Sequence, residues 1–387
     1  MSLGSRVRRS LFATLVLAAL TPLACVCARE KSSNDKGDQT DGGGGGVDPV
    51  VELAKGFSLD KGLATADMAE IAKAPHPLGS ARQAEVIDWL EKRVTDMGLS
   101  AAREPFTATV PNPAALEQTG GPVADTIEKK GVNLYAHGTH AEGSAPCVVA
   151  LASHSDTKIV PNVDYLGAND SGSSSIVLLQ QLAYLKAKGK DLGLVCEIVA
   201  IWFDGEEAVL YNWTDGEKIH PAKIVDNLYG SRYAAARLTA CTGEGYGPAG
   251  APALCLPKGL LGEGDGPPLV ALVLMDMIGS PGLVLSRDSN STESLVSLAA
   301  SGATALGFGS HYATSFKAIE DDHLPYLARG VPAVDLIDFH HLDVWHKDGD
   351  EPAAISQESM EIAGKIALYV ALKVAREPKV FPAKADP

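Results

Sequence analysis

Residues 194 to 207 read Leu194-Val-Cys-Glu-Ile-Val-Ala-Ile-Trp-Phe-Asp-Gly-Glu-Glu207, and they indicate the fold class most directly. The part up to Phe203 is mostly apolar and rich in β-branched residues, which predicts a buried strand, and Asp204-Gly205 predicts the turn that ends it. Glu206 and Glu207 follow directly. Because successive residues leaving a strand point to opposite sides, one carboxylate can bind a metal while the other transfers protons. A solvated loop is the simpler interpretation unless other ligands converge on this pair.

Further acidic and histidine residues stand at the ends of other predicted elements. They are His154 and Asp156 after the apolar run 147–153, Asp170 before a predicted helix, Asp276 after the run 269–275, and His346 after the run 333–337. The carboxyl ends of parallel strands meet at one edge of an open α/β sheet, where ligands bind. Imidazole and carboxylate groups are zinc ligands, so their convergence with the glutamate pair predicts a zinc site.

Helical patterns alternate with these strands. We expect helices over about 80–97, after residues 171–175, and over about 356–375. Ser80 and Gln83 have the spacing of a capping box at the start of the first helix. The chain is therefore predicted to form an α/β fold: a single globular domain whose central twisted sheet is mixed but mostly parallel, with helices on both faces.

The N-terminal residues 1–27 have the layout of a secretory signal, because arginines precede an apolar run that is too short to span a bilayer. We expect residues 28–54, which are polar and rich in glycine, to form a flexible tether, and residues 55–387 to form the globular domain. The protein is thus predicted to be exported and to be periplasmic, lipid-anchored or secreted. Cys25 is the candidate for a lipid anchor, although Pro22 stands where lipoprotein signals carry an aliphatic residue.

The formal net charge of −15 argues against nucleic acid or an anionic membrane surface as a partner. Cys241 and Cys255 bracket a stretch rich in Gly and Pro, and we expect them to form a disulfide in an oxidising compartment. Cys147 and Cys196 lie inside apolar runs, and we expect each to be a small buried hydrophobic residue. No feature of the sequence sets the oligomeric state.

Several short motifs carry a resemblance to a known family. They are His154-Ser-Asp156, Gly167-Ala-Asn-Asp170, Asp204-Gly-Glu-Glu207, Asp276 and Trp345-His346. Together they resemble the zinc aminopeptidases of the M28 type. The stretches 203–208, 228–232, 274–279 and 319–332 narrow the resemblance to glutaminyl-peptide cyclotransferases, or glutaminyl cyclases. The resemblance covers about residues 60 to 375 and implies the M28 zinc-peptidase fold.

A cyclase closes an N-terminal glutamine of a peptide or protein onto its own side-chain amide and releases ammonia. The resemblance implies one zinc ion, held by Asp170, Glu207 and His346, with a coordination position left open for the substrate. It also implies that Glu206 takes a proton from the substrate amine and returns it to the leaving nitrogen.

Four further residues receive roles from the same resemblance. Asp276 and Asp321 would belong to a hydrogen-bonded carboxylate network that positions the substrate amine. Trp213 and Trp345 would line the pocket and exclude water; ordinary packing is the alternative interpretation for both.

A hydrolase is the competing prediction. An M28 aminopeptidase binds two zinc ions, and here the second would be held by His154 and Asp276, with Asp170 as the bridge and Asp156 orienting His154. The insertion after Glu207 and the stretch 320–323 resemble cyclases more than peptidases, whereas the stretch 335–341 reads more like peptidase sequences. A third interpretation, a binding protein on an inactive hydrolase scaffold, predicts that a ligand or the proton carrier is replaced, and none is.

Overall fold

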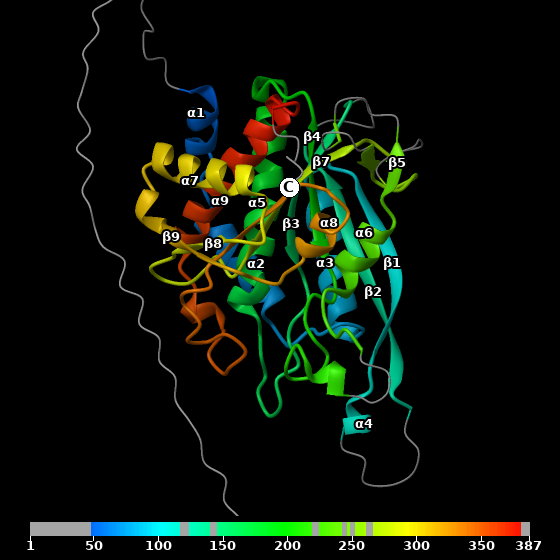
Figure 1. Ribbon diagram of the computed structural model, residues 1–387. Helices are drawn as coiled ribbons and strands as arrows, with labels where there is room; N and C mark the ends of the chain where they lie inside the picture. The colour runs from blue at the N-terminus through cyan, green and yellow to red at the C-terminus, as the bar shows by residue number, and fades with distance from the viewer. Residues whose placement is uncertain are drawn as a thin grey trace, which may run out of the picture. The chain divides into compact units, whose positions relative to one another are not determined.

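In the computed structural model, a six-stranded sheet with the order β1-β2-β4-β3-β7-β10 lies at the centre of the folded unit (Figure 1). The strands are β1 (Ala101–Pro111), β2 (Thr126–His137), β3 (Val148–His154), β4 (Glu197–Phe203), β7 (Leu269–Asp276) and β10 (Ala333–Ile337). Strands β4, β3, β7 and β10 pair in parallel, whereas β1 with β2 and β2 with β4 pair antiparallel. The predicted mixed, mostly parallel sheet is confirmed.

The structure describes residues 48–116, 124–139, 145–218, 224–241, 246–247, 252–260 and 266–380. Helix α1 (Pro49–Lys55) falls in the last part of the predicted tether and buries Val50, Val51 and Ala54 in the core. The predicted signal and most of the predicted tether lie outside the described residues. Within those ranges, none of the helices has the length and apolarity that crossing a bilayer requires.

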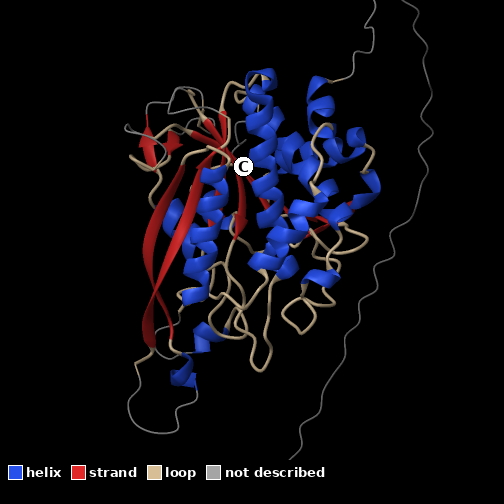
Figure 2. Ribbon diagram, turned by 180° about the vertical axis from the view of Figure 1, so that it is seen from behind, coloured by secondary structure: helices blue, strands red, loops and turns tan. Residues whose placement is uncertain are grey.

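The four parallel strands are buried on both faces, and their side chains alternate between two apolar cores. On β4, Ile198, Ala200 and Trp202 belong to one core, whereas Val199 and Ile201 belong to the other. The first core also contains residues of α1, α2 (Lys61–Ile71), α3 (Ala81–Asp96), α5 (Ser174–Lys188), α7 (Glu293–Leu306) and α9 (Gln357–Arg376). The second contains residues of α6 (Tyr229–Ala236) and α8 (Leu324–Leu327). Helices therefore cover both faces, as predicted, and Figure 2 shows the helix-rich side.

The remaining described α-helix and strands are short. They are α4 (Pro113–Leu116), the antiparallel pair β5 (Thr239–Cys241) and β6 (Ala253–Cys255), and the parallel pair β8 (Leu285–Asp288) and β9 (Tyr312–Lys317).

The predicted capping box of α3 is half correct. Ser80 caps the helix, since its side chain accepts a hydrogen bond from the backbone N–H of Gln83. The Gln83 side chain does not return to Ser80 but donates to Ser155 Oγ at 2.9 Å and to Asp204 Oδ1 at 3.0 Å. Gln83 thus joins the helix to the segments that leave β3 and β4, where the site residues lie.

Both pairs of described cysteines form disulfides. The predicted bond between Cys241 and Cys255 is confirmed. The expectation for Cys147 and Cys196 is wrong in part: both are buried, but they are bonded to each other. The parallel register of β3 and β4 pairs Val148 with Glu197, so the cysteines that precede these two residues lie side by side.

The same registers align the carboxyl ends of the parallel strands. His154 of β3 lies opposite Phe203 of β4, and Asp276 of β7 lies opposite Ile337 of β10. The chain segments that follow these strands therefore leave the sheet along one edge, as the sequence predicts.

Candidate active site

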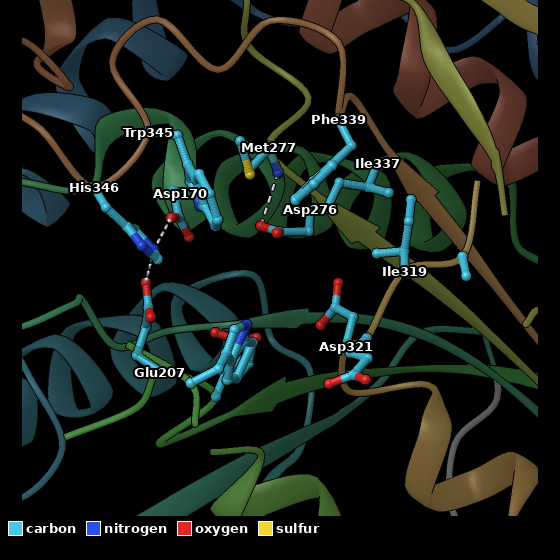
Figure 3. A pocket seen from close by; sticks show the side chains of 14 residues that line it. Asp170, Glu207, Asp276, Met277, Ile319, Asp321, Ile337, Phe339, Trp345 and His346 are labelled. Carbon is cyan, nitrogen blue, oxygen red and sulfur yellow. Dashed lines mark hydrogen bonds and ion pairs between the residues drawn. The ribbon is translucent and has the colours of Figure 1, made fainter. Parts of the chain in front are cut away.

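A cavity of about 270 Å³ lies at this edge of the sheet (Figure 3). Its lining consists of Asp170, Glu206, Glu207, Trp213, Asp276, Met277, Ala318, Ile319, Glu320, Asp321, Ile337, Phe339, Trp345 and His346. The volume is slightly below the range of about 300–1,000 Å³ that holds drug-sized ligands, so the cavity suits a single side chain with its backbone. All the predicted ligands of a single zinc ion, the predicted proton carrier and both predicted tryptophans meet here.

Among the described residues, two triads could bind a metal. Asp170, Glu207 and His346 form the first, the pocket triad, and each offers one ligand atom within 4.8 Å of the others. His346 Nε2 lies 2.9 Å from Glu207 Oε1 and 3.4 Å from Asp170 Oδ2, as Figure 3 shows. Burial alone would lower the pKa of His346, but the charge of Glu207 and the hydrogen bond to Asp170 raise it to about 10. The metal-free site therefore holds a proton on His346 at neutral pH.

This triad fits a zinc ion. Two carboxylates and one imidazole are typical zinc donors, and tetrahedral bonds of about 2.0–2.2 Å place ligand atoms about 3.3–3.6 Å apart. The distance of 3.4 Å between His346 and Asp170 meets this spacing, and the contact of 2.9 Å with Glu207 needs only a small opening. Three protein ligands beside a cavity are the arrangement of a catalytic zinc site, in which the remaining position is open.

His154, Asp170 and Asp276 form a second triad, the buried triad, which shares Asp170 with the first. His154 Nε2 lies 3.0 Å from Asp170 Oδ1 and 3.3 Å from Asp276 Oδ1. His154 is fully buried and does not line the described cavity. The residues predicted for a second zinc ion are thus close enough to bind one, although their histidine lies behind the cavity.

Glu206 lines the cavity but belongs to neither triad. Burial raises its pKa well above the ordinary range of a glutamate, and the neighbouring charges of Glu207 and Asp321 add to this, against the opposing charge of His154. A carboxyl group with a raised pKa can both accept and donate a proton near neutral pH.

The backbone that carries the glutamate pair is held by several hydrogen bonds. The Asp156 carboxylate accepts the backbone N–H groups of Glu206 at 3.0 Å and Glu207 at 3.4 Å. Gly205 has a φ of 75°, which favours glycine, and a Cβ there would lie 2.9 Å from the Leu78 side chain. Asp156, which was predicted to orient His154, also lies 3.5 Å from Nδ1 of that ring.

Asp276 and Asp321 line the cavity away from His346 (Figure 3). Burial raises the pKa of Asp276, and it raises that of Asp321 well above the usual range, with the charge of Asp276 adding to the second shift. Asp335, in the middle of β10, is also fully buried, and burial together with the charge of Asp321 raises its pKa well above the usual range. Raised pKa values favour the protonated forms of these acids, which lowers their mutual repulsion. Asp321 Oδ2 and both carboxylate oxygens of Asp335 have no hydrogen-bond partner among the described residues.

The opposite side of the cavity is apolar. Met277, Ile319 and Ile337 form a small buried cluster, against which Phe339 and Trp345 pack. The Trp345 ring also stacks on the His346 ring, with centroids 4.2 Å apart, so it helps to fix the orientation of that imidazole. Trp213 is half-buried and completes the lining.

Three neighbours of the triads were not anticipated from the sequence. Asp350 accepts the backbone N–H groups of Asn169 at 2.7 Å and Asp170 at 3.2 Å. Tyr165 donates its hydroxyl to Asp170 Oδ2 at 2.9 Å, and Lys158 lies 3.5 Å from Glu207 Oε2. Only Lys158 carried a local signal, because it follows His154 and Asp156 in the same short segment.

The fold and the site define a class of protein. The chain belongs to peptidase family M28, whose family model matches residues 133–371, more than half of the chain.

The resemblance to glutaminyl-peptide cyclotransferases is also confirmed. The chain is 28% identical over 246 residues to the glutaminyl-peptide cyclotransferase of Drosophila melanogaster. The aligned region covers 58% of this chain and 60% of that relative. The chain therefore spans about three fifths of the length of that relative.

Solved structures show the same fold. A glutaminyl cyclase from an Acidobacteriales bacterium matches with a TM-score of 0.59 and 23% identity, covering 88% of this chain and 100% of that chain. A leucine aminopeptidase precursor from Bacteroides thetaiotaomicron matches with a TM-score of 0.60 and 16% identity, covering 83% of this chain and 96% of that chain. Because proteins with both names match about equally well, the fold alone does not choose between them.

Proposed function

We propose that the protein is a zinc-dependent glutaminyl-peptide cyclotransferase, which converts the N-terminal glutamine of peptides or proteins to pyroglutamate and releases ammonia. One observation carries the proposal: the small cavity holds Glu206, a buried carboxyl group outside both triads, next to the pocket triad. Sequence similarity to the Drosophila glutaminyl-peptide cyclotransferase supports the same reaction.

The two sides of the cavity suit the two parts of an N-terminal glutamine. The carboxyl groups of Glu206 and Asp321 provide acceptors for the α-amine, which is largely protonated at neutral pH. The apolar side around Ile319, Phe339 and Trp345 contacts the methylene groups of the substrate and excludes water.

Asp170, Glu207 and His346 would hold the zinc ion. When bound there, zinc supplies Lewis-acid polarisation of a carbonyl oxygen.

Glu206 carries the proton. It takes a proton from the neutral form of the α-amine as the amine nitrogen forms a bond to the carbon of the side-chain amide. It returns the proton to the amide nitrogen as the bond between that carbon and nitrogen breaks. Ammonia leaves and the five-membered lactam remains, so all atoms and protons balance. Asp276 and Asp321 position the amine and Glu206 through the network of buried acids.

A di-zinc aminopeptidase is the second candidate function, and the buried triad is the observation that favours it. With ions in both triads, Glu206 would take its proton from water and the product would be a free N-terminal residue. The two candidates thus share their residues and differ in the nucleophile.

Product identity separates them. Purified, zinc-loaded protein is incubated with a peptide that begins with glutamine, and with the same peptide beginning with leucine. We expect the first peptide to lose the mass of ammonia without release of an amino acid, and the second to stay unchanged. Release of the first residue from either peptide would identify a peptidase instead.

We also propose that the enzyme acts after export, in the periplasm, outside the cell or on a lipid anchor at Cys25. The two disulfides support an oxidising compartment. The net charge of −15 favours peptide substrates over nucleic acid as partners.

A further inference from the structure

Lys158 is a buried cation beside the candidate zinc site. It is 2% exposed, and among the described residues it is the only lysine or arginine in the buried interior. Burying an ammonium group is costly unless it is paired and hydrogen-bonded, so its partners indicate what holds it there.

All the contacts of Lys158 Nζ go to one short segment. It donates hydrogen bonds to the backbone carbonyls of Ala208 at 2.7 Å and Leu210 at 3.0 Å, and it lies 3.5 Å from Glu207 Oε2. An ammonium group has three N–H donors, and these three acceptors match that number. Lys158 therefore binds the side chain of Glu207 and the backbone that follows it at the same time.

The two oxygens of Glu207 face different partners. Oε2 faces the Lys158 ammonium, whereas Oε1 lies 2.9 Å from His346 Nε2, on the side of the pocket triad. A carboxylate can bind a metal through one oxygen or through both. Oε2 therefore lies beside Lys158, whereas Oε1 is directed at His346 of the pocket triad.

The segment after Glu207 is also held from its other side. Asp226 accepts the backbone N–H groups of Val209 at 2.9 Å and Leu210 at 2.8 Å, while Lys158 binds the carbonyls of Ala208 and Leu210. A cation and an anion thus fix the direction of this backbone together. The position of Glu207 depends on Lys158 both through its carboxylate and through the chain that follows.

We propose that Lys158 is a positioning residue, which restricts Glu207 to binding the metal through Oε1 and offsets part of the negative charge buried around the pocket triad. This inference rests on the zinc site of the proposed function. It concerns metal binding first and turnover only as a consequence.

The test compares three variants. Lys158→Met removes the charge and all three contacts but keeps a long unbranched side chain. Lys158→Gln keeps an N–H donor for the carbonyls and removes the charge. Lys129→Met is the matched control, because Lys129 Nζ also donates to a backbone carbonyl, that of Leu78 at 2.9 Å, but contacts no residue of either triad.

The readouts are the zinc dissociation constant, measured by competition with a chelator, and the melting temperature of the metal-free protein. We expect Lys158→Met to weaken zinc binding about 10–100-fold, the usual effect of losing a partner of a metal ligand. Lys158→Gln should fall between Lys158→Met and the wild type, and Lys129→Met should bind zinc like the wild type. A purely structural lysine would lower the melting temperature while leaving the zinc affinity of the folded protein unchanged, and that result would overturn the proposal.

A crystal structure of the zinc-loaded wild type tests the same inference even if the variants do not fold. It should show Glu207 bound to zinc through Oε1 alone, with Oε2 beside Lys158. Binding of zinc by both oxygens of Glu207 would contradict the proposal. If the wild type binds zinc but does not cyclise glutamine, the proposed function is wrong. The test of Lys158 still applies in that case, because it measures zinc binding and not turnover.

Discussion

The two triads that meet at Asp170 differ in their access to substrate. In the pocket triad, Glu207, Asp170 and His346 all line the cavity, and the His346 side chain is 17% exposed. In the buried triad, the His154 side chain is 0% exposed and lies behind Asp170 and Asp276. Similar donor sets on the same edge of one sheet are thus placed at different depths.

This difference explains how one arrangement of residues can serve two chemistries. All three residues of the pocket triad line the cavity, whereas in the buried triad Asp170 and Asp276 line it and His154 does not. An enzyme that needs one polarising ion requires only the first triad, while a hydrolase that activates water between two ions requires both. We therefore expect zinc in the pocket triad to be sufficient for activity.

Removing one histidine from each triad should give the largest contrast. His346→Ala should lose turnover completely, because it removes a metal ligand. Loss of a residue that only holds a metal ligand in place weakens metal binding about 10–100-fold, and His346→Ala should weaken zinc binding by more than that. His154→Ala, the matched substitution in the buried triad, should keep one zinc ion and most of the cyclase activity. Metal analysis and initial rates on both variants measure this, and equal losses in the two variants would mean that the triads act as one site.

Glu206→Gln should give the next largest effect. Zinc binding and the melting temperature should stay at the wild-type level, because Glu206 belongs to neither triad, while kcat falls about 10²–10⁴-fold with the loss of the proton carrier. Glu320→Gln makes the same change in an exposed carboxylate of the same cavity and should leave kcat nearly unchanged. Near-full activity in Glu206→Gln would remove Glu206 from the mechanism.

Zinc binding should strengthen as the pH rises. The pKa of His346 is about 10 without metal, so below that pH zinc must displace a proton from its ring, and the affinity should fall about tenfold per pH unit from this group alone. Burial would lower the pKa of His154, but hydrogen bonds to Asp156, Asp170 and Asp276 raise it well above the usual range. Calorimetry in buffers of different ionisation enthalpy counts the protons released. If a second zinc ion binds in the buried triad, a second proton should be released, from His154.

The smallest effect is expected at the rim of the cavity. Trp213→Ala removes a half-buried ring that lines the cavity and belongs to neither triad. We expect a loss of about 1 kcal/mol in substrate binding, which corresponds to about a fivefold lower kcat/KM. Tyr211→Ala is the control, because Tyr211 is 51% exposed on the same loop and does not line the cavity. A change in zinc affinity in Trp213→Ala would show that the rim and the pocket triad are coupled.

The sequence predicted the parts of this arrangement that depend on local signals. Apolar runs located β3, β4, β7 and β10, and the acidic and histidine residues near their ends predicted a zinc site at one edge of the sheet. The resemblance to M28 enzymes supplied the members of each triad. Asp335, in the middle of the run 333–337, was not singled out from the sequence, although it lies among the buried acids.

Contacts between distant segments were beyond the reach of such signals. Asp350 binds the backbone at Asn169 and Asp170 across about 180 residues of chain, and nothing in its own surroundings indicates a partner. The bond between Cys147 and Cys196 depends on the register of two strands, which the sequence alone did not specify. Gln83 has the spacing of a capping residue, but its side chain binds Ser155 and Asp204, two buried residues that directly follow β3 and β4.

The central claim is that one zinc ion in the pocket triad supports cyclisation. The most direct measurement adds zinc stepwise to metal-free protein and follows pyroglutamate formation from a glutamine-initiated peptide by mass spectrometry. We predict that the rate reaches its plateau at one zinc ion per chain and that the peptide loses only ammonia. A rate that rises until two zinc ions per chain are bound, with release of free glutamine, would contradict the claim and identify a di-zinc aminopeptidase.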